Sequence, residues 1–346
     1  ELPENFTDDF DYRMYLFKDK IYYLCKNVKF KKTGDNRGNR FYEIILKIKE
    51  ASEEKIDSLI PAPEAGLADG LLFGGDGRLS QDVKDDFSRT GMTHIVAVSG
   101  YNVTIIAEYL MLLGIFLGLW RKQAFYFAVF GIFVFVLMIG MPSSAIRAGV
   151  MGTLLLWAMK NGRIASSYNA IALAGAIMIF VNPLLLRWDI GFQLSFLATL
   201  GIVVMGQFWE RYFSKKNDAL GLLEVMFMTV SAQIFVLPII TYNFHTFSVV
   251  SVLVNVLVLQ VVPISMFLVF MVVVFGFIFY PLSVVFSWLA YLTLWYEVEV
   301  IRYFSGFDWA SREVNNFRWW GVLIWYVVLV GVVYIFKRIE RKRGLV

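Results

Sequence analysis

The stretch DDFSRTGMTHIVAVSGYNV (Asp85–Val103) separates two parts of the chain that differ in composition. Before it, charged and apolar residues are mixed. After it, apolar runs follow one another with few charges between them. The stretch passes from a charged helix end through Gly91 and His94 to a small polar break at Ser99 and Gly100, and then enters an apolar run. We therefore predict two regions, residues 1–90 and residues 91–346.

The composition indicates a membrane protein. The chain has 346 residues, of which 58% are hydrophobic, and its mean hydropathy is +0.62. Charged residues make up 17%, against roughly 25% in an average soluble domain. A soluble globule cannot hide so much apolar surface, so the sequence predicts an all-α polytopic membrane protein.

Charge is divided unevenly between the two parts. Residues 1–90 hold 15 Lys and Arg against 18 Asp and Glu, whereas residues 91–346 hold 17 against 10. The positive excess of the membrane part is typical of basic cytoplasmic loops or of a path for an anionic ligand.

Cysteine and histidine are too few for several kinds of site. Cys25 is the one cysteine, which excludes an internal disulfide, and the two histidines lie far apart without cysteine partners. We expect no metal and no cofactor. The first residues carry no secretory signal, and because the sequence starts with Glu1 we expect it to be part of a longer protein.

Residues 1–90 are predicted to form a small α+β region outside the cytoplasm. Lys20–Lys31 is rich in β-formers, and the spacing of apolar residues predicts an amphipathic helix over Phe41–Leu59. Further helices are predicted over Glu64–Phe73 and Asp82–Thr90, the latter stopped by Gly91. The residues expected on one face of the amphipathic helix are Ile44, Ile45, Ile48, Ile56 and Ile60.

The apolar runs predict about eight membrane crossings. Between residues 247 and 306, the basic tail requires one segment that does not cross, because three full crossings would place that tail outside. The interfacial candidate is Tyr291–Phe304, and the alternative is Phe247–Val261 as a re-entrant half-helix before Pro263. The runs are Tyr101–Trp120, Ala124–Met141, Ala145–Met159, Tyr168–Val181, Gly191–Trp209, Leu222–Ile240, the tract from Phe247 to Trp295, and Trp319–Phe336.

The basic loops predict the orientation. Met141–Ser144 and Thr241–Thr246 carry no basic residue, whereas the loops after odd-numbered spans do. The N-terminal region is therefore expected outside the cytoplasm and the tail KRIERKRGLV inside. The basic residues of these loops are Arg121, Lys122, Lys160, Arg163, Arg211, Lys215 and Lys216.

Polar residues inside the apolar runs are the candidates for function, because such residues are costly at membrane depth. Arg147 stands near the start of a short run, and Asp189 and Gln193 are spaced to share one helix face. Each also has a structural alternative: Arg147 as an interfacial arginine, Asp189 paired with Arg187, and Asn255 as a contact between helices. His94 is more often structural than functional in such a setting.

Three segments of this sequence resemble the transmembrane competence domain of bacterial competence proteins of the ComEC type. They are AGLADGLLFGGDGRLSQDVKDDFSRTGMTHIVAVSGYNV, PSSAIRAGVMG and SSYNAIALAGAIMIFVNPLLLRWDIGFQLSFLATLGIV. Their order and spacing match over Phe10–Asn255, and more loosely beyond. Many relatives carry a histidine where this chain has Asn102. The other matching positions are Gly75, Asp76, Gly91, His94, Ser99, Gly100, Arg147, Ala148, Asn182, Pro183, Asp189, Gly191, Phe192, Gln193 and Ser195.

The resemblance implies an inner-membrane channel that passes single-stranded DNA into the cytoplasm during transformation. It implies only the trailing part of an OB-like domain, around Lys20–Lys49, and no metallo-β-lactamase-like nuclease domain in this sequence. We therefore expect no enzyme activity. The implied partners are single-stranded DNA, membrane lipids, an outer DNA receptor, a cytoplasmic translocase, a separate nuclease and a second copy of the chain. The residues expected along the path are His94, Ser99, Asn102, Arg147, Asp189, Gln193, Ser195 and Asn255.

Other functions remain open from the residues alone. A small-solute transporter would fit the broken helices and polar positions. A membrane enzyme could use Asp189, Glu108 or His94 as an acid or base, and would need two such groups converging in a closed pocket. A scaffold for other uptake proteins would need no continuous path.

Overall fold

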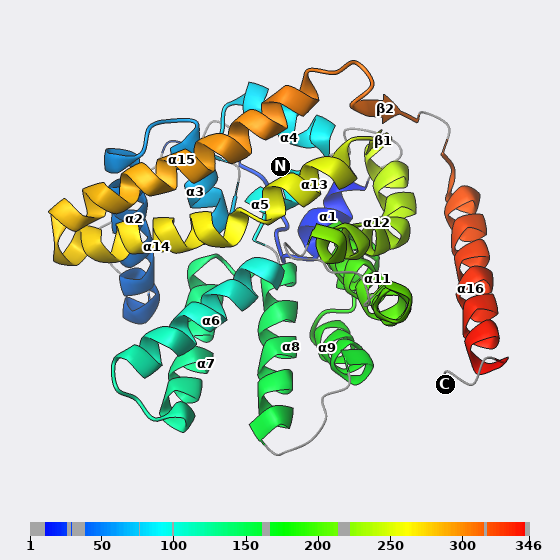
Figure 1. Cartoon of the computed structure of the whole chain (residues 1–346), viewed down its shortest axis with the longest axis horizontal. Helices are drawn as coiled ribbons and strands as arrows, with labels where there is room; N and C mark the ends of the chain where they lie inside the picture. Colours follow the sequence, from blue (N-terminus) through cyan, green and yellow to red (C-terminus); the bar gives the residue numbers. More distant parts are fainter. Residues whose placement is uncertain are drawn as a thin grey trace.

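The structure, a computed structural model, is mostly helical and describes residues 11–25, 29, 39–75, 77–98, 100–160, 167–213, 222–314 and 317–342 (Figure 1). The predicted helical class is therefore confirmed. Its helices are α1 (Tyr12–Phe17), α2 (Arg40–Leu59), α3 (Glu64–Phe73), α4 (Gln81–Thr90), α5 (Thr93–Val96), α6 (Gly100–Phe116), α7 (Arg121–Met138), α8 (Ser143–Lys160), α9 (Ser167–Val181), α10 (Leu185–Trp188), α11 (Ile190–Phe213), α12 (Leu222–Phe244), α13 (Ser251–Leu259), α14 (Val262–Ile278), α15 (Tyr280–Ser305) and α16 (Trp319–Lys342). The strands are β1 (Thr246–Ser248) and β2 (Ser311–Glu313).

Helix α3 lies at the centre of the hydrophobic core, and all ten of its residues are buried. It contacts α2, α5, α14 and α15, so the N-terminal region and the late helices share one core. Gly70 permits close packing, because a Cβ at this position would lie 2.6 Å from Cγ1 of Val96 on α5. The small residues of AGLADG thus bring α3 against its neighbours.

The N-terminal helices confirm most of the predicted elements. α2, α3 and α4 lie where the sequence predicts helices, and Gly91 ends α4 in the left-handed conformation with φ of +73°. The predicted apolar face of α2 is buried only in part. Ile45 and Ile56 are buried, but Ile44 and Ile48 are exposed. Residues 20–25 form no strand, and most of the rest of Lys20–Lys31 lies outside the described residues.

Three helices of the described residues are long and apolar enough to cross a membrane: α7, α12 and α15. Shorter apolar helices occur within α6, α9, α11 and α16. These helices fit a membrane protein. The count of eight crossings and the orientation of the termini stay predictions, and the loop residues Arg163, Lys215 and Lys216 lie outside the described part.

The region from Phe247 to Gly306 contains both a broken helix and a long continuous one. α13 and α14 meet at a bend of 46°, which fits the predicted half-helix before Pro263. Tyr291–Phe304 is the second half of the 26-residue helix α15, and its place at the membrane interface stays a prediction. Figure 1 shows the α14–α15 hairpin running across the upper part of the view, whereas α7 and α8 run down it.

The two short strands pair antiparallel in the membrane part of the sequence, with Phe247 opposite Arg312. They connect the segment before α13 to the segment after α15. α16 stands at the edge of the molecule and packs against α12, where Trp325 Nε1 and Tyr326 Oη donate hydrogen bonds to the carbonyls of Ile234 and Phe235. The partial OB-like domain is not seen in the described residues and stays a prediction.

The buried carboxylate of Asp69 holds the loop after α3 in place through an ion pair with Arg78. Asp69 lies in α3, and its Oδ2 is 2.8 Å from Nη1 of Arg78, which also pairs with Glu53 and Asp57 of α2. Burial raises the pKa of Asp69 to about 7, and the charge of Arg78 offsets this only in part because the two other carboxylates act against it.

This raised pKa predicts a pH-dependent stability. The carboxyl of Asp69 ionises at a higher pH in the folded protein than in the unfolded chain. Its contribution to the free energy of unfolding is therefore complete at low pH and is lost as pH rises through about 7. Raising the pH from about 5 to about 8 should therefore lower the thermal midpoint of the natural protein more than that of Asp69→Asn. Asp82→Asn, which removes an exposed acid of α4, is the control and should leave the pH dependence unchanged. Equal slopes for Asp69→Asn and the natural protein would contradict this prediction.

Candidate functional site

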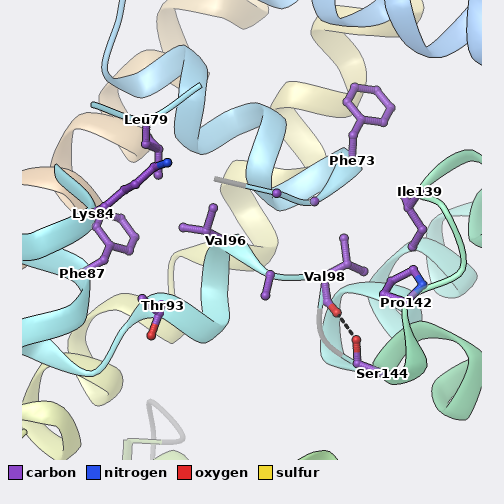
Figure 2. A pocket seen from close by; sticks show the side chains of 13 residues that line it. Phe73, Leu79, Lys84, Phe87, Thr93, Val96, Val98, Ile139, Pro142 and Ser144 are labelled. Carbon is purple, nitrogen blue, oxygen red and sulfur yellow. Dashed lines mark hydrogen bonds between the residues drawn. The ribbon is translucent and has the colours of Figure 1, made fainter. Parts of the chain in front are cut away.

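A cavity of about 410 Å³ lies where the stretch Asp85–Val103 meets the turn between α7 and α8 (Figure 2). Val96 and Val98 form its wall on one side, and Ile139 and Pro142 face them from the turn. The hydroxyl of Ser144 donates a 2.7 Å hydrogen bond to the carbonyl of Val98 and joins the two sides. The cavity is mostly apolar, so it favours an apolar group over a bare ion.

The backbone conformation explains why glycine stands at two motif positions of this region, Gly75 and Gly91. Both have positive φ, of +98° and +73°, a conformation that side chains with a Cβ rarely adopt. Gly75 lines the cavity and its N–H donates to the carbonyl of Val96. Asp76 and Ser99 lie outside the described residues, so their predicted roles are not tested.

Arg147 is a buried positively charged residue on α8. It lies in the second turn of α8 with 7% of its surface exposed, and its guanidinium donates to the carbonyl of Ser195 and, at 2.5 Å, to the hydroxyl of Thr199 on α11. Its guanidinium carbon is 5.7 Å from the centre of the Phe196 ring. Its Nε has no hydrogen-bond partner among the described residues. Arg147 therefore keeps a positive charge without a carboxylate beside it in the described structure.

The start of α6 lies directly against this arginine. A Cβ added to Gly100 would lie 2.8 Å from Nη2 of Arg147, so any larger residue at this position would require the guanidinium to shift. The first N–H groups of a helix carry a partial positive charge, and a guanidinium adds a full one. The two together make a local environment that favours an anion, such as a phosphate group.

Asp189 forms an ion pair with Lys18, a residue that was not among the candidates from the sequence. Its Oδ2 is 3.2 Å from Nζ of Lys18, and both side chains are almost fully buried. Its Oδ1 accepts from the backbone N–H of Phe192 at 2.8 Å and so begins α11. The alternative partner Arg187 instead lies over the ring of Trp188. Asp189 thus anchors the N-terminal segment to α11.

The side chains of Gln193 and Asp189 have different hydrogen-bond partners. Its amide donates to the carbonyls of Leu186 and Arg187, which closes the turn before α11. A Cβ at Gly191 would be 3.1 Å from Asp189 Oδ1, so this glycine leaves space for the capping carboxylate. Pro183 lies in the turn between α9 and α10. The backbone N–H of Gln193 donates to the carbonyl of Asp189 at 3.1 Å, as the predicted i, i+4 spacing requires, and a joint role of the two side chains stays a prediction.

Of the remaining candidates, His94 and Asn255 lie within hydrogen-bond reach of each other, whereas Asn102 and Ser195 lie elsewhere. Asn102 is buried and donates to the carbonyl of Leu71, so it holds α6 to α3 and does not line the cavity. Asn255 donates a 2.8 Å hydrogen bond to Thr229, in agreement with its structural alternative as a contact between helices. His94 is exposed, with Nδ1 3.1 Å from the carbonyl of Gly91. The side-chain hydroxyl of Ser195 is buried without a partner in the described structure.

The acids and bases of an enzyme site do not converge in the described residues. Glu108 is exposed on α6, Asp189 is paired with Lys18, and neither they nor His94 line the cavity. Among the described residues, no three metal-binding side chains lie close enough together to hold a metal ion.

The family follows from a comparison with known proteins. The sequence profile of the competence protein family matches residues 71–339, which contain the cavity, Arg147 and Asp189. The chain belongs to the competence protein family. The resemblance seen in the three sequence segments is thereby confirmed.

The chain is also similar to ComE operon protein 3 of Bacillus subtilis (strain 168), with 27% identity over 308 residues. This match covers 89% of the chain but only 37% of the relative, so the chain spans little more than a third of the length of that protein. No solved structure matches the chain.

Proposed function

We propose that this chain forms an inner-membrane path through which single-stranded DNA enters the cytoplasm in natural transformation. Membership of the competence protein family and the similarity to a ComE operon protein support a role in DNA uptake. We propose no catalytic step for this chain. Its partners would be single-stranded DNA and membrane lipids, with a receptor outside, a cytoplasmic translocase, a separate nuclease and a second copy of the chain.

The observation that carries the proposal is the Arg147 site. A nucleic acid strand presents one phosphate after another, and a path for it needs positive charge with contacts that tolerate any base. Arg147 offers a guanidinium beside the start of α6, and the neighbouring cavity is apolar enough to receive a base or sugar face. We infer that phosphates pass Arg147 one at a time.

One buried arginine supplies a short stretch of such a path. The surplus of Lys and Arg in residues 91–346 would add attraction at the cytoplasmic side. A second copy of the chain would double the number of guanidinium groups, and a cytoplasmic translocase would supply the pull. We therefore include the second copy of the chain and the translocase among the proposed partners.

The proposal is tested with the whole protein in lipid vesicles. A labelled single-stranded oligonucleotide should become inaccessible to an added nuclease in vesicles that contain the protein, and should stay accessible in empty vesicles. A strand that stays outside while a small solute enters with saturation would contradict the DNA path and favour the transporter.

A further inference from the structure

Glu297 is a carboxyl group that the proposed DNA path does not use. It lies in the last third of α15 with 0% of its surface exposed. Its neighbours along the buried face of α15 are Leu294, Val298 and Ile301, which are also buried. Its Oε1 is 2.6 Å from the hydroxyl of Ser265 on α14, and its Oε2 has no hydrogen-bond partner among the described residues.

No charged group of the described structure faces this carboxyl. α13 and α14 carry no titratable residue, and on α15 the exposed Glu299 and Arg302 pair with each other at 2.6 Å. Ser265 is the side chain in hydrogen-bond contact with Glu297. The charged residues of the two other helices packed against α15 are Glu64 and Asp69 of α3, and Asp82, Lys84, Asp85, Asp86 and Arg89 of α4.

The hydroxyl of Ser265 has two acceptors within reach but only one proton to donate. It lies 2.6 Å from Oε1 of Glu297 and 3.4 Å from the carbonyl of Val261. If Glu297 were ionised, the hydroxyl would have to turn to it and leave a buried negative charge with a single neutral donor, which is unfavourable. If Glu297 carries a proton, it donates to Ser265, and Ser265 donates to Val261, so both contacts are satisfied.

We infer that Glu297 and Ser265 form a proton-binding site between α14 and α15. When the site is loaded, the carboxylic acid is neutral and fits the apolar contact. Release breaks the O–H bond, leaves the electron pair on the carboxylate and passes the proton to a water molecule. The carboxylate then needs water or a cation, so release of the proton is linked to opening of the α14–α15 contact. This inference stands independently of the DNA path.

Infrared spectroscopy of the whole protein in lipid vesicles tests the site. At about pH 7, the difference between the natural protein and Glu297→Gln should contain the carbonyl band of a protonated carboxylic acid, because a buried unpaired carboxyl stays neutral. Glu299→Gln is the matched control on the same helix. It removes an exposed, paired carboxylate and should show carboxylate bands instead. A Glu297→Gln difference with carboxylate bands alone would overturn the inference.

Ser265→Ala keeps the test decisive if Glu297→Gln does not insert into the membrane. Removal of the hydroxyl deletes the hydrogen bond partner at 2.6 Å, so the acid band of the natural protein should shift in frequency. A spectrum that Ser265→Ala leaves unchanged would show that the acid band belongs to another residue and would overturn the site.

Discussion

DNA uptake is expected to be lost when Arg147 is replaced by glutamate. The substitution turns the buried positive charge beside the start of α6 into a negative one, which repels each phosphate. Arg147→Gln removes the positive charge and the guanidinium donors without adding a negative charge, and should reduce uptake by about tenfold or more, because a hydrogen bond to a charged group contributes about 1.5–3 kcal/mol. The measurement is entry of labelled strand into vesicles and transformation frequency in cells.

Two further variants separate this role from a role in folding. Arg147→Lys keeps the charge but cannot reach Ser195 and Thr199 together as the guanidinium does, so it should retain part of the uptake. Arg40→Gln removes an exposed arginine at the start of α2, outside residues 91–346, and should leave uptake unchanged. If Arg147→Glu and Arg147→Gln take up DNA as well as the natural protein at equal expression, the assignment of Arg147 to the path is wrong.

Gly201→Ala is expected to have the largest effect on stability. Gly201 of α11 lies against α12, and a Cβ there would be 2.5 Å from the backbone carbonyl oxygen of Ser231 and 2.9 Å from the ring of Phe235. Because a backbone atom cannot move aside alone, the two helices must separate. Such overpacking costs about 1–3 kcal/mol, and the thermal midpoint should fall accordingly.

Gly206→Ala is the matched control in the same helix. Among the described residues, no atom lies within 4 Å of a Cβ at Gly206, so the substitution meets open space there. Alanine favours a helix by roughly 0.8–1 kcal/mol over glycine, and the thermal midpoint should stay the same or rise slightly. Equal thermal midpoints for the two variants would show that α11 and α12 do not pack at Gly201 as the structure has them.

Local signals in the sequence were sufficient for the N-terminal helices. Pro63 and Gly74 flank α3, and the left-handed Gly91 ends α4, so capping residues alone set these limits. Helical periodicity was not sufficient to choose the buried face of α2. Ile44 and Ile48 belong to the same apolar stripe as Ile56, and periodicity does not say which part of a stripe meets protein and which meets lipid.

The candidate site was predictable only in part, because its partners are far apart in sequence. Arg147 was identifiable since a charge in an apolar run is costly. Lys18 was not, because it lies among ordinary charged residues 171 positions before its partner Asp189. Glu297 lies in the segment Tyr291–Phe304, which the sequence predicts at the interface, and only the contact of α14 with α15 shows it buried.

The complete burial of α3 has a consequence for the order in which the chain assembles. Synthesis proceeds from the N-terminus, so α3 is made long before α14 and α15, the helices that cover it. Until both have been inserted, ten residues that include Leu67, Leu71 and Phe73 lack most of their native cover. The N-terminal region must therefore wait, bound to membrane or chaperone, for the last third of the chain. A mutation that disrupts α14 or α15 would therefore leave α3 exposed, and cellular quality control would detect that exposed N-terminal segment.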